Sequence, residues 1–151
     1  MLRGAKKAYT DGMTFEGNGG ESVPPRREIP HYHGDEVRVL FFVGAIVLVV
    51  AQSTGADLPL STIGAVVSAV VLVITAGITN PAQRGIHWAN ALISMTGALL
   101  FGLTAVDQYR AGMRLLDPSF VYVEVLALLS LVALYFTTRT IRGIWQRPDL
   151  S

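Results

Sequence analysis

Two apolar stretches decide the fold of this chain: residues 60–78 are LSTIGAVVSAVVLVITAGI, and residues 86–106 are IHWANALISMTGALLFGLTAV. Each stretch has about the 20 residues that a helix needs to cross a hydrocarbon core ~30 Å thick. The polar turn TNPAQRG joins them, and Pro81 ends the first helix because proline lacks an amide donor. The two stretches therefore predict a transmembrane hairpin.

Shorter apolar runs flank this hairpin on both sides, at residues 39–51 and 120–136. The first run has only 13 residues, so its helix has to include flanking residues in order to cross the membrane. We therefore predict an all-α protein, a four-helix transmembrane bundle whose membrane domain covers residues 36–147. The expected spans are residues 36–54, 60–79, 85–106 and 119–138.

The composition supports a membrane protein. Hydrophobic residues make up 51% of the chain and charged residues only 15%, and the charges gather in the tails and turns. Soluble domains intersperse the two classes, whereas membrane proteins segregate them. The formal net charge of +1, without a basic patch, argues against a nucleic-acid partner. The absence of cysteine excludes disulfides and metal sites held by thiolates.

The two ends of the chain show little apolar periodicity. Residues 1–35 combine glycines and prolines with charges, and such a segment cannot bury enough apolar surface to offset its conformational entropy. We expect a flexible cytoplasmic tail there, and a short tail at residues 148–151. Because the first 36 residues contain no long apolar run, the first span is expected to act as the insertion signal.

The distribution of Lys and Arg predicts the orientation. Ten of the twelve lie on one side of the expected membrane, and only Arg110 and Arg114 lie on the other. The positive-inside rule then puts both termini in the cytoplasm of a multi-pass protein of the cell membrane. Trp88 and Trp145 fall at the inner boundary, and the basic segment around Trp145 is typical of an interfacial anchor.

Polar residues share one face of the third expected helix, where His87, Asn90 and Ser94 follow one another at spacings of three and four residues. Polar groups that face hydrocarbon go unsatisfied, so this face is expected to point into the bundle. Hydrogen bonds between helices account for these polar residues without a ligand. On the second expected helix, small residues follow one another at similar spacings and predict close helix contacts: Ser61, Gly64 or Ala65, Ser68 or Ala69, and Thr75 or Ala76. We expect the same of Gly97 or Ala98 on the third, and bulky changes at Gly64 or Gly97 to impair assembly.

Glu124 is the only carboxylate inside an apolar run. Ionisable groups within spans are costly and often functional, so Glu124 is a candidate for binding protons or cations. In its four spans and its membrane carboxylate the chain resembles the small multidrug transporters, whose carboxylate lies in the first helix instead. The structural alternative puts Glu124 near the outer interface, where it is either paired with Arg110 or Arg114 or solvated because it lies at shallow depth.

The three histidines, His31, His33 and His87, are all expected on the cytoplasmic side. With Asp35 and Glu36 nearby, they are candidate ligands for a divalent metal, because imidazole and carboxylate both bind such ions. The alternative interpretation is that they are ordinary interfacial histidines. The sequence contains no phosphate loop, Ser-His-Asp set, zincin helix or dinucleotide fingerprint, so we expect neither an enzyme nor a cofactor.

Together these patterns favour a non-enzymatic accessory or assembly protein. Its expected partners are the lipid bilayer and either other membrane proteins or further copies of itself. The second hypothesis is a small oligomeric transporter or channel that uses Glu124. The third is metal binding or sensing through the histidines at the cytoplasmic face.

Overall fold

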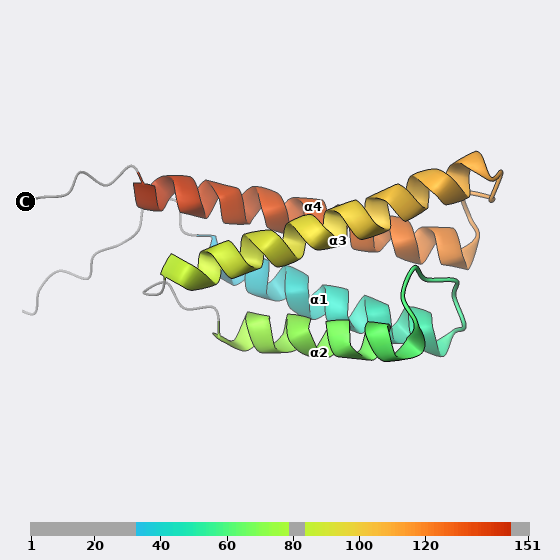
Figure 1. The fold of residues 1–151 in the computed structure, drawn as a ribbon, viewed down its shortest axis with the longest axis horizontal. Helices are drawn as coiled ribbons and strands as arrows, with labels where there is room; N and C mark the ends of the chain where they lie inside the picture. Colours follow the sequence, from blue (N-terminus) through green and yellow to red (C-terminus); the bar gives the residue numbers. More distant parts are fainter. Residues whose placement is uncertain (1–32, 79–83, 146–151) are drawn as a thin grey trace, which may run out of the picture.

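The computed structural model describes residues 33–78 and 84–145, which form four helices and the connections between them (Figure 1). No strand occurs in these residues, so the expected all-α class is confirmed for them. The predicted tails lie almost entirely outside the described residues. The helices are α1 (Gly34–Ser53), α2 (Thr62–Ile78), α3 (Arg84–Arg110) and α4 (Pro118–Trp145).

Local chemistry explains where α1 begins and ends. Asp35 and Glu36 lie in its first turn, where negative charge complements the positive end of the helix dipole. His33 is the N-cap residue, and its side chain makes no capping hydrogen bond. After Ser53, the chain reverses at Gly55, whose φ of 72° is the left-handed conformation that favours glycine.

The last two helices extend beyond their expected spans. α3 ends at Arg110 and α4 at Trp145, four and seven residues past the predicted ends at positions 106 and 138. The added residues are mostly polar, so hydropathy marks only the apolar part of each helix. A helix continues through polar residues until a breaker ends it, and α3 stops just before Gly112, which has a φ of 80°.

The four helices form an open row in the order α2, α1, α4, α3. Extensive contacts join α1 to α2, α1 to α4, and α3 to α4. Figure 1 shows α2 lying along α1, while α3 crosses α4 on the other side. Since α2 and α3 are not in close contact along their length, the row does not close into a regular bundle with two neighbours for each helix.

Small residues form the buried side of α2. Its buried positions are Ala65, Ala69, Thr75 and Ala76, which agrees with the small-residue stripe read from the sequence. Gly64 lies beside this stripe, where an added Cβ atom would meet only Leu60 and Ser61 of its own segment. Of the two expected alternatives, Ala65 is therefore the buried one, and Gly64 is not at a contact between helices.

Arg38 connects the start of α1 to the end of α2. Its Nε donates a hydrogen bond of 2.9 Å to the carbonyl oxygen of Ala76, in the last turn of α2, and its Nη1 lies 3.5 Å from Oδ1 of Asp35. Carbonyls in the last turn of a helix lack donors within the helix. Arg38 thus supplies a charged donor to a group that the α2 backbone does not itself satisfy.

We expect Arg38→Gln to lower the free energy of unfolding by about 1–2 kcal/mol, because a charge-assisted hydrogen bond is lost at a partly exposed site. Thermal unfolding of the purified protein in detergent measures the effect. Arg139→Gln is the control, since Arg139 is exposed on α4. Equal shifts in the two variants would show that the bond to Ala76 contributes nothing.

Candidate functional site

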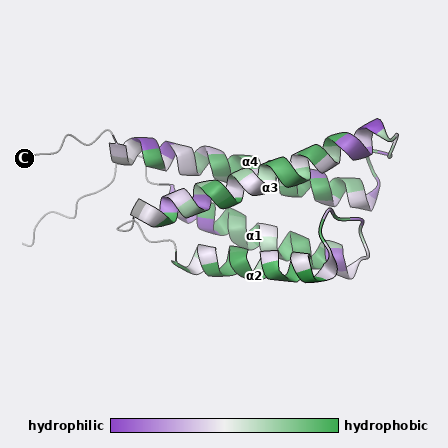
Figure 2. Ribbon diagram, viewed as in Figure 1, coloured by the Kyte–Doolittle hydropathy of each residue, from purple (hydrophilic) through white to green (hydrophobic). Residues whose placement is uncertain are grey.

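The interior of the helix row contains several polar residues among its apolar ones. His87, Asn90 and Ser94 are all buried on α3, with at most 2% of each residue exposed. On α4, Thr137 and Thr140 are equally buried and donate hydrogen bonds to the carbonyls of Ala133 and Phe136. Large apolar residues are exposed on all four helices, and Figure 2 shows hydrophilic residues concentrated at the two ends.

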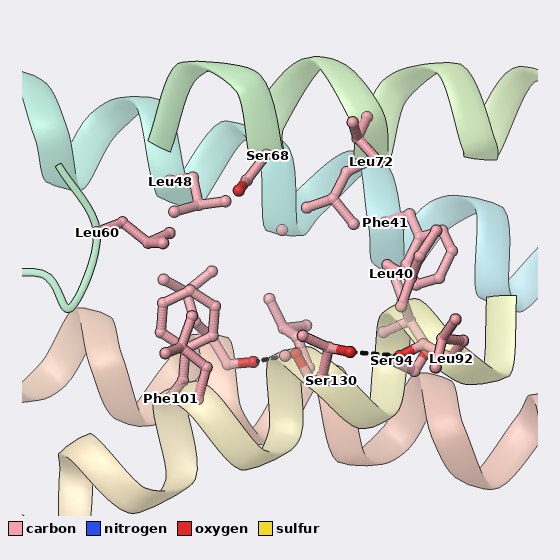
Figure 3. A pocket seen from close by; sticks show the side chains of 18 of the residues that line it. Leu40, Phe41, Leu48, Leu60, Ser68, Leu72, Leu92, Ser94, Phe101 and Ser130 are labelled. Carbon is pink, nitrogen blue, oxygen red and sulfur yellow. Dashed lines mark hydrogen bonds between the residues drawn. The ribbon is translucent and has the colours of Figure 1, made fainter. Parts of the chain in front are cut away.

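A cavity of about 320 Å³ lies where α2 and α3 fail to meet (Figure 3). Side chains from all four helices line it, and most of them are apolar. Phe41 of α1 and Phe101 of α3 are the aromatic residues in the lining, and Leu48 and Leu72 lie above them in the view of Figure 3. Ligand sites in proteins typically have volumes of about 300–1,000 Å³ and a mainly apolar lining, so this cavity has the size of a small binding site.

Three serine hydroxyls are the main polar features of this central cavity: Ser68 of α2, Ser94 of α3 and Ser130 of α4. Ser130 Oγ donates to the Leu126 carbonyl oxygen over 2.8 Å. Ser94 Oγ is buried and has no hydrogen-bond partner among the described residues. No lining residue is charged. The cavity is therefore suited to apolar groups, and it offers no site for stabilising an ion.

Glu124 lies away from this cavity. It is half-buried in the second turn of α4 and is not among the lining residues. Within residues 33–78 and 84–145, the two ion pairs are His33 with Glu36 and Arg38 with Asp35. The expected pairing of Glu124 with Arg110 or Arg114 is thus not formed, and its role in binding protons or cations stays a prediction.

The two described histidines, His33 and His87, lie in different surroundings. The His33 amide donates to Thr140 Oγ1 over 3.2 Å, and its ring lies 3.4 Å from Glu36 Oε1 and packs on Phe136. His33 therefore attaches the start of α1 to α4. His87 is buried on α3, and His31 lies outside the described residues. In the described part of the chain, no three residues of the types His, Cys, Asp and Glu form a group that could hold a metal.

The sequence indicated the polar face of α3 but not the cavity beside it. A cavity depends on which helices pack together, and the apolar faces of α1 and α2 carry no signal that distinguishes one neighbour from another. Ser68 was expected only as part of the small-residue stripe of α2. Ser130 was not singled out, because a lone serine in an apolar helix is common. Comparisons with protein-family models, curated proteins and solved structures found no match.

Proposed function

We propose that this protein is a four-span membrane protein with both termini in the cytoplasm of the cell membrane. α3 and α4 contain segments, Gly85–Arg110 and Pro118–Gly143, that are long and apolar enough to cross a membrane. Only 22% and 33% of their most apolar windows are buried, unlike the core helix of a soluble protein. α1 and α2 lie alongside them. α2 has 17 residues, the lower limit for a membrane helix, and α1 has 20, although its first turn carries Asp35 and Glu36.

Within the membrane, we propose a non-enzymatic accessory role in which a transmembrane helix of a partner protein covers the central cavity. The open row of helices is the observation that carries this proposal, since it leaves a vacant position between α2 and α3. Helices in membranes associate through close van der Waals packing, and a cavity between two helices forgoes those contacts. A fifth helix at this position would restore them.

The chemistry around the mouth of the cavity fits an apolar helix. Val67 and Val71 of α2 and Leu92 of α3 line the cavity and are also exposed, so they form its rim. The volume is about twice that of a 150 Å³ protein cavity that accommodates benzene, so it has room for large side chains projecting from a partner. The hydroxyl of Ser68 points into the cavity (Figure 3) and can form one hydrogen bond with a polar side chain of the partner helix.

A photo-cross-linking amino acid at position 67 tests this proposal in native membranes. Illumination should join the protein to one foreign membrane subunit, because Val67 lies on the rim. The same probe at position 39 is the control, since Val39 is 62% exposed on α1 and does not line the cavity. Adducts only with lipid, or only with a second copy of the chain, would reject the partner helix.

The Glu124→Gln variant distinguishes an accessory protein from a transporter. Glu124→Gln is expected to leave cross-linking at position 67 unchanged, because Glu124 is not part of the cavity lining. If the protein is a transporter, the Glu124 carboxyl should be necessary for transport. Proton or cation flux into liposomes should then be lost in Glu124→Gln.

A further inference from the structure

A second hollow lies on the outer side of the α3–α4 pair. Its volume is about 690 Å³, and it runs between the first half of α3 and the last half of α4. Its apolar floor includes Ala91 and Met95 of α3 with Leu134 and Ile141 of α4. Both tryptophans of the chain, Trp88 and Trp145, lie at one end of it. We call this hollow the tryptophan groove.

The tryptophans mark the depth of this groove in a membrane. Their rings lie 6.4 Å apart, measured between centroids, and both residues are more than half exposed. Indole rings are enriched where hydrocarbon meets the lipid headgroups, because the ring is apolar and its N–H is a hydrogen-bond donor. Trp88 is one turn into α3 and Trp145 ends α4, so this end of the groove is at the membrane boundary proposed above.

The length of the groove matches one lipid leaflet. Leu134 and Trp145 are eleven residues apart on α4, and a rise of 1.5 Å per residue separates them by about 16 Å along the helix axis. Half of a hydrocarbon core ~30 Å thick is about 15 Å. An acyl chain can therefore lie on the apolar floor while its headgroup remains beside the tryptophans.

The charge at the tryptophan end is positive. Arg142 lines the groove, is exposed, and takes part in neither of the two ion pairs that the described residues form. Arg139 is also exposed, one turn earlier on α4, and no carboxylate lines the groove. A guanidinium group can bind two phosphate oxygens at once, which a neutral side chain cannot do with comparable strength.

We propose that the tryptophan groove binds an anionic phospholipid of the leaflet in which it lies. One acyl chain lies on the floor, and the negatively charged phosphate pairs with Arg142, at the end of the groove where Arg139 is also exposed. This proposal depends on the membrane location proposed above. It is independent of the partner helix, because the groove and the central cavity open on different sides of α3, although Leu92 borders both.

Tryptophan fluorescence tests the proposal without a label, because Trp88 and Trp145 are the only two tryptophans of the chain. The full-length protein is placed in vesicles that contain either dibrominated phosphatidylglycerol or dibrominated phosphatidylcholine, and bromine quenches any indole that it touches. We expect phosphatidylglycerol to be preferred over phosphatidylcholine at the groove by about fivefold, because one arginine lies near the negative headgroup. Arg142→Gln should remove this preference.

Two matched variants complete the experiment. Arg114→Gln, in the loop between α3 and α4 at the opposite end of the helices, should retain the preference of the unmodified protein. Ala91→Leu fills the floor and should reduce quenching by both lipids. Equal quenching by the two lipids in the unmodified protein would overturn the lipid site alone. Failure of the protein to enter vesicles at all would overturn the membrane location and the lipid site together.

Discussion

Gly97→Leu is expected to abolish stable packing of α3 against α4. A Cβ atom at position 97 would lie 2.6 Å from Ser130 Oγ and 3.3 Å from Ser130 Cβ, so the Ser130 side chain of α4 has to shift. Overpacking by one or two methylene groups costs typically about 1–3 kcal/mol, and leucine adds more than that against this side chain. We expect the free energy of unfolding to fall by more than about 3 kcal/mol.

The measurement is thermal unfolding in detergent, with Gly102→Leu as the matched control. Gly102 lies on the same helix, and an added Cβ atom there meets nothing within 4 Å. A second pair of variants identifies the clash: Ser130→Ala should recover part of the stability lost in Gly97→Ala, because it removes the closer of the two contact atoms. Similar unfolding temperatures for Gly97→Leu and Gly102→Leu would refute the close contact.

The contrast between Gly64 and Gly97 shows what the sequence could not decide. Both glycines belong to small-residue patterns, yet only Gly97 lies against another helix. Spacing predicts which residues share a face of a helix but not which neighbour that face meets. The burial of Ala65 and Ala69 follows from the pattern, whereas the order α2, α1, α4, α3 does not.

The candidate sites were predictable to different degrees. His87, Asn90 and Ser94 could be assigned to a buried face because polar groups are costly in hydrocarbon, and the structure buries all three. The tryptophan groove was suggested only indirectly, since the sequence put Trp88 and Trp145 at one boundary without indicating that their rings pack together. The central cavity had no sequence signal, because it results from contacts that α2 and α3 do not make.

Ser68→Phe is expected to prevent the proposed partner helix from binding while leaving the four helices folded. Ser68 is half-buried on α2 and points into the central cavity, which is large enough for the added ring (Figure 3). Filling the cavity with a side chain of the protein itself removes the space into which the partner projects. Residues at the centre of an interface contribute most to binding, so we expect the yield of the cross-link from position 67 to fall by about tenfold or more.

Val66→Phe is the matched control. It also introduces phenylalanine on α2, two residues from Ser68, but Val66 is 53% exposed and outside the cavity lining. It should leave the cross-link intact, and both variants should unfold within a few degrees of the original protein. If Ser68→Phe unfolds at the original temperature and still cross-links fully, the cavity is not where the partner binds. If it is more stable and loses the cross-link, the ring has replaced the partner's contacts, and the vacant position between α2 and α3 is the docking site.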